Sequence, residues 1–168
     1  MRKVESILRR VLEEQRADPR RVIWAVGRVV EDVYREVEAR GRLVDDRLED
    51  GLAAVQRFCL DPESMGTQEI RDQYHGQLLD DWRAIMRMPD PTGRDTKLWI
   101  VIAAVRMLVH VAADVASGYA IRAIQREIIE SLEYVRSAWE FRLGEPTAAA
   151  EDRVLFTLKG ALAEEEPR

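Results

Sequence analysis

Apolar residues recur at steps of three and four positions along almost the whole chain. This spacing places them on one side of an α-helix, whereas a half-buried strand would need alternation at every second position. Charged residues fill the gaps, so each segment has an apolar and a polar side. The pattern predicts helices at about 2–16, 19–41, 45–60, 67–85, 98–116, 121–143 and 147–162.

Proline and glycine mark the boundaries between these helices. Two prolines and a glycine fall within 89–93, where no helix can continue. No proline interrupts 96–143, but one helix of that length would extend about 70 Å, which is too long for a domain of this size. We therefore expect a break near Ser117 and Gly118, and a second one at Gly144 to Pro146.

The segment 98–116 differs from the others because it is apolar nearly all the way round. A helix of this kind is typical of the centre of a protein. The sequence therefore predicts an all-α fold, a single-domain bundle of six or seven mainly antiparallel helices around a central apolar helix at about 97–116.

The length and composition favour one domain. The chain has 168 residues, of which 46% are hydrophobic and 34% charged, and this is enough for one sizeable core. We expect a helical domain at 1–163 and a flexible acidic tail at 164–168. The segments 48–55 and 128–135 align with each other, which leaves open a weak repeat of two units hinged at 89–95.

The charges argue against two classes of partner. The 26 basic and 31 acidic side chains are interleaved, so no basic excess indicates a nucleic-acid partner. The apolar segment near residue 110 contains ionisable groups in its middle, which argues against a membrane span. A lone cysteine, Cys59, and the lack of a secretory signal pattern lead us to expect a cytoplasmic protein.

Three ionisable residues share one stripe of the apolar segment. Arg106, His110 and Asp114 are four positions apart, so each is turned by only about 40° from the one before. One interpretation is a structural network that fixes the register of the helix, in which Asp114 accepts from His110 and Arg106 meets a carboxylate of another helix. The alternative is a polar pocket in which His110 is a general acid or base or a ligand, Asp114 orients it and Arg106 holds an anion.

A metal site has acceptable ligands but weak spacing. The candidates are His75, His110 and Asp114, with Asp72 as an addition. No pair of histidines at i and i+4, and no Glu-x-x-His, accompanies them. We therefore expect neither a metal nor another cofactor.

The two terminal helices carry apolar stripes that can face a partner. We predict partner-binding residues at Val4, Ile7, Leu8, Val11, Val154, Leu155, Phe156 and Leu158. The leading hypothesis is a non-enzymatic binding protein, a subunit, adaptor or inhibitor that acts on another protein or on its own copy. The alternative is an enzyme or a small-ligand or metal-binding bundle with its pocket at the Arg106, His110 and Asp114 stripe.

Overall fold

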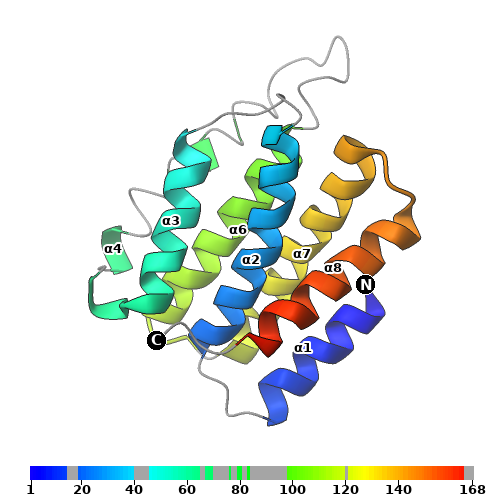
Figure 1. Cartoon of the computed structure of the whole chain (residues 1–168). Coiled ribbons are helices and arrows are strands. Elements are labelled where there is room, and N and C mark those ends of the chain that lie inside the picture. The colour runs from blue at the N-terminus through cyan, green and yellow to red at the C-terminus, as the bar shows by residue number, and fades with distance from the viewer. Residues whose placement is uncertain are drawn as a thin grey trace.

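The chain folds into helices that pack together (Figure 1). The computed structural model describes residues 1–14, 19–39, 46–64, 67–69, 76, 79–80, 83, 98–119 and 121–164. Its long helices are α1 (Arg2–Glu14), α2 (Pro19–Ala39), α3 (Asp46–Leu60), α6 (Leu98–Ala116), α7 (Ile121–Leu143) and α8 (Thr147–Ala163). Two short pieces, the 3₁₀ turn η1 (Pro62–Ser64) and α4 (Thr67–Glu69), follow α3.

The all-α prediction is confirmed for the described part of the chain, which contains six packed helices and no strand. The colours of Figure 1 show that the neighbouring pairs α2 and α3, α6 and α7, and α7 and α8 run in opposite directions. Helix α2 contacts α3, α6, α7 and α8, while α6 contacts α2, α3, α4 and α7. The proposed hinge at 89–95, most of the helix predicted at 67–85, and residues 165–168 of the tail predicted at 164–168 lie outside the described residues.

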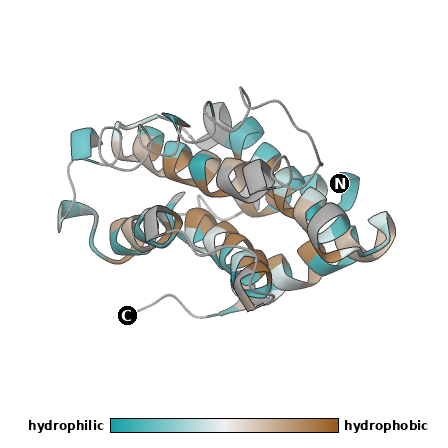
Figure 2. Cartoon of the chain, turned by 90° about the horizontal axis from the view of Figure 1, so that it is seen from above, coloured by the Kyte–Doolittle hydropathy of each residue, from teal (hydrophilic) through white to brown (hydrophobic). Residues whose placement is uncertain are grey.

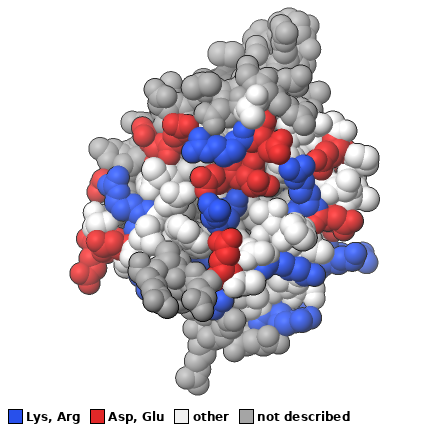
Figure 3. Space-filling view, in the orientation of Figure 1, with Lys and Arg blue, Asp and Glu red and all other residues white. Residues whose placement is uncertain are grey.

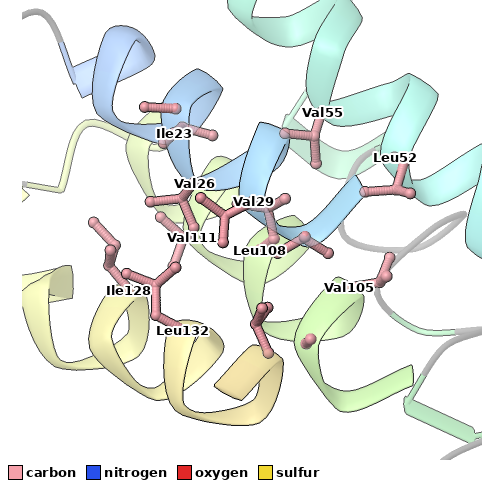
Figure 4. Close-up of a cluster of buried hydrophobic side chains, with 14 of the residues drawn as sticks. Ile23, Val26, Val29, Leu52, Val55, Val105, Leu108, Val111, Ile128 and Leu132 are labelled. Carbon is pink, nitrogen blue, oxygen red and sulfur yellow. The ribbon is translucent and has the colours of Figure 1, made fainter. Parts of the chain in front are cut away.

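The core lies where α2, α3, α6 and α7 face one another. Figure 4 shows Val26 of α2, Leu108 of α6 and Leu132 of α7 converging on this region, with Val55 of α3 beside them. All four side chains are buried. Figure 2 shows hydrophobic residues turned mainly toward the space between helices and hydrophilic ones turned outward, as the three-and-four spacing predicts.

The predicted break between α6 and α7 is confirmed. Gly118 has a φ of 84°, a left-handed conformation that glycine adopts at low cost. The amide of Gly118 donates to the carbonyl of Val115 at 3.0 Å, and the amide of Tyr119 donates to that of Asp114 at 3.1 Å. These two bonds form a Schellman motif, which satisfies the last carbonyls of α6 and turns the chain into α7. Gly144, with a φ of 75°, ends α7 as predicted.

Polar contacts also join the helices. The hydroxyl of Ser131 on α7 is buried and donates to the carbonyl of Ala104 on α6 at 3.0 Å. The guanidinium of Arg21 on α2 donates to the carbonyl of Leu162 at 2.9 Å, near the C-terminus of α8, where a cation is favoured. In the described part of the chain, no helix is both long and apolar enough to cross a bilayer.

Candidate functional site

Arg106, His110 and Asp114 lie on α6 and together form what we call the α6 stripe. This stripe holds one histidine–carboxylate pair. The Nε2 atom of His110 lies 3.5 Å from the Oδ2 atom of Asp114, as the spacing of four residues permits. The side chain of His110 is 37% exposed and that of Asp114 is 18% exposed. The pair is therefore at the edge of the bundle, in reach of solvent, rather than sealed in the core.

Arg106, the third member of the stripe, interacts with α7. Burial of its guanidinium lowers the pKa of Arg106, while the nearby Tyr134 and Glu130 on α7 oppose this shift. One of its terminal nitrogens lies 3.4 Å from the sulfur of Met107. The neighbouring carboxylate favours the charged form of Arg106, which supports the network interpretation for this residue.

Tyr134 and Glu130 are themselves joined. The hydroxyl of Tyr134 donates to Oε1 of Glu130 at 3.4 Å. Burial, and then the negative charge of Glu130, raise the pKa of Tyr134, so its hydroxyl stays protonated. Both residues line a hollow of about 710 Å³ between α1 and α7, whose lining does not include Arg106, His110 or Asp114. This hollow therefore borders the α7 neighbours of Arg106, Tyr134 and Glu130.

The described residues supply no further ligands for the candidate metal site. His75 and Asp72 lie outside them. Within the described part of the chain, no three side chains of His, Cys, Asp or Glu come together as a metal would require. Cys59 is buried on α3.

The residues predicted to bind a partner fall into two groups. Val4, Leu8, Val154 and Leu158 are fully buried and form part of the chain's own core. Ile7, Val11 and Leu155 are partly buried, and Phe156 is 80% exposed. Ile7 and Val11 line a groove of about 310 Å³ between α1 and α8, together with Leu162, Arg10 and Lys159.

Phe156 lines a second hollow, about 550 Å³ in volume, between α2 and α8. Its charged lining residues are Arg28, Glu31, Asp32, Arg35, Arg153 and Glu164. Figure 3 shows acidic and basic side chains intermingled on this face. Burial raises the pKa of Asp32 in this hollow, although the positive charge of Arg153 acts in the opposite direction.

Arg153 joins three helices, and the sequence pattern did not single it out. Its guanidinium lies 3.0 Å from a carboxylate oxygen of Glu36 on α2 and 2.6 Å from one of Glu145. It also stacks 3.7 Å from the ring of Trp139, a cation–π contact. Glu36 is far from Arg153 in sequence, so no local spacing could have indicated this junction of α2, α7 and α8.

Comparison with protein-family models, with curated proteins and with solved structures finds no match for this chain.

Proposed function

We propose that the protein is a non-enzymatic binding protein that recognises a protein partner through the outer face of α8. The observation that carries this proposal is Phe156, whose side chain is 80% exposed near the middle of that helix. Large aromatic side chains in such positions are the residues that contribute most to protein interfaces. The rest of α8 supports the proposal, because Val154 and Leu158 hold the helix against the core and fix its outer face.

The surroundings of Phe156 suit a specific contact. It borders the hollow between α2 and α8, whose charged groups are held by ion pairs such as Arg28 with Glu31 at 3.1 Å and Arg153 with Glu36 at 3.0 Å. A partner would therefore meet charged groups that are already positioned, which lowers the entropic cost of binding. An exposed apolar anchor beside a polar rim is the usual composition of an interface.

Photo-cross-linking tests this proposal. We would replace Phe156 with benzoyl-phenylalanine and irradiate cells that express the chain. The matched control carries the same group at Tyr119, which is 56% exposed at the turn after α6. We expect a discrete cross-linked product at position 156 only. Excess unlabelled chain should suppress the product, whereas the Phe156→Asp chain should not.

Two outcomes would contradict the proposal. One is a lack of any product at position 156, and the other is the same set of products at positions 156 and 119. Either would mean that the exposed ring at Phe156 has no specific partner.

We further propose that α6 is the helix around which the bundle assembles. Its described inward side chains are buried, among them Val105, Leu108 and Val109. Hydrogen exchange of the backbone amides tests this, because the helix at the centre of a cooperative unit opens only with global unfolding. We expect the amides of Val105 to Ala112 to exchange more slowly than those of Leu155 to Lys159 in α8. Equal rates in the two helices would argue against a central α6.

A further inference from the structure

The outer face of α8 has a charge pattern that complements itself. Asp152, Phe156 and Lys159 are all exposed. At about 100° per residue they fall within a sector of about 60° on the helix, so they form one stripe. We call these three residues, with the exposed Ala149, Gly160 and Ala163, the α8 outer stripe.

We propose that the α8 outer stripe binds the same stripe of a second copy of this chain, with the two α8 helices antiparallel. This inference rests on the proposed function and names the partner. A two-fold axis between residues 155 and 156 sets position 152 of one helix opposite position 159 of the other. Asp152 then meets the partner's Lys159, and Lys159 meets the partner's Asp152.

The geometry of one helix makes these two charges available. Asp152 and Lys159 are two turns apart, about 10 Å along the axis, so they are too far apart to pair within a single helix. Among the described side chains of this chain, neither has an ion pair that would have to be broken. Both lie on the same flank of Phe156. A two-fold axis perpendicular to the helices places this flank of one helix beside the same flank of the other.

The remaining residues of the stripe suit a close approach. Phe156 lies next to the axis, so the two phenylalanine rings meet at the centre of the contact. The small residues Ala149 and Ala163 lie toward the two ends of the stripe. A Cβ atom added at Gly160 would meet nothing within 4 Å, so this position opens onto free surface.

The charges on the opposite flank of α8 do not oppose this pairing. Arg153 lies on the opposite flank and is already held by Glu36 and Glu145. Glu164 lies on that same opposite flank, at the α2–α8 hollow. The like charges of two copies are thereby kept away from the Asp152 and Lys159 contacts.

The size of the contact indicates a reversible dimer. Helix α8 has 17 residues, so the contact is about 25 Å long. One helix per copy buries an area at or below the low end of the roughly 1,200–2,000 Å² that stable complexes bury. We therefore expect monomer and dimer to exchange on dilution.

Charge reversal on the full chain tests the proposal. We would measure the dimer dissociation constant by sedimentation equilibrium from low micromolar to millimolar protein. Asp152→Lys and Lys159→Asp each replace two attractions per dimer by two repulsions, so each should weaken the dimer by at least about tenfold. The Asp152→Lys/Lys159→Asp double variant should restore the dissociation constant to within about threefold of the original. Phe156→Ala should weaken it by about thirtyfold.

The outcomes separate this inference from the proposed function. A chain that stays monomeric to millimolar concentration, or a double variant no better than the single ones, overturns the dimer. In that case a cross-linked product from position 156 whose mass differs from that of two chains still supports a protein partner. A product with the mass of two chains, 19.4 kDa each, together with charge rescue, supports both. Circular dichroism on every variant confirms that α8 remains folded.

Discussion

The α6 stripe and the α8 outer stripe are opposite exceptions to the helical pattern. Helix α6 carries ionisable residues on an apolar background, and α8 carries a large apolar residue on its polar side. The side chain of Asp114 is only 18% exposed, whereas Phe156 is 80% exposed. The polar exception therefore lies partly buried at the edge of the bundle, where groups of the same chain reach it, and the apolar exception is turned away from the bundle.

The difference teaches which kind of exception points to a partner. A polar group near the core is costly unless the chain itself supplies a partner, and α6 does so through His110 with Asp114 and through Glu130 near Arg106. An exposed aromatic ring gains nothing from the chain that carries it. It gains only when another surface covers it.

The largest expected effect tests the two sides of α8 against each other. Leu158→Ala removes a fully buried side chain and should lower the free energy of unfolding by about 2–5 kcal/mol. Phe156→Ala removes an exposed one and should change it by no more than about 0.5 kcal/mol. Urea unfolding of dilute, monomeric protein measures both. A cost of several kcal/mol for Phe156→Ala would mean that the ring belongs to the core.

A smaller effect is expected where α8 joins α2. Arg153→Met keeps the aliphatic stem but removes the ion pairs with Glu36 and Glu145 and the contact with Trp139, at a cost of about 1–2 kcal/mol. The matched control is Arg28→Met, which removes one exposed pair with Glu31 and should cost less than about 0.5 kcal/mol. Thermal unfolding of both variants compares them, and equal costs would show that Arg153 is not a junction.

How much of the structure the sequence could predict depends on how far apart in sequence the contacting residues are. The six long helices, the break at Gly118 and the pairing of His110 with Asp114 follow from residues within a few positions of one another, and all three were predicted. The junction at Arg153 and the bond from Ser131 to Ala104 join distant residues, and no local pattern indicates them.

Burial of the terminal stripes shows the same limit. The spacing of Val4 and Leu8 identifies an apolar side but does not say whether the chain or a partner covers it. The structure buries both residues under the chain's own helices. Phe156 lies off the stripe that Val154 and Leu158 form, and its 80% exposure follows from that position.

Substitution in the α6 stripe should lower the free energy of unfolding by less than substitution of Leu158 or Arg153. Asp114→Asn removes a partly exposed pair whose atoms are 3.5 Å apart, so we expect a loss of less than about 1 kcal/mol. The control is Asp50→Asn on α3, an exposed position where we expect almost no change. Urea unfolding at neutral pH measures the difference. A loss of several kcal/mol at Asp114 would mean that the pair stabilises the fold as strongly as a buried core side chain does.

The last test concerns a pH dependence in the hollow beside the α8 outer stripe. Burial raises the pKa of Asp32 above its ordinary value of 3.8, so the folded state holds this proton more tightly than the unfolded state. The contribution of Asp32 to stability is therefore fully present below about pH 3.8 and is lost as the pH rises through the raised folded pKa. Asp32→Asn cannot titrate, so it should gain stability relative to the original chain over that rise. Urea unfolding from about pH 3 to about pH 7 follows this difference.

Asp32→Ala should give the same slope, because the slope depends only on the carboxyl that has been removed. A slope of the opposite sign would mean that the attraction of Arg153 outweighs burial and that the hollow already stabilises the ionised carboxylate.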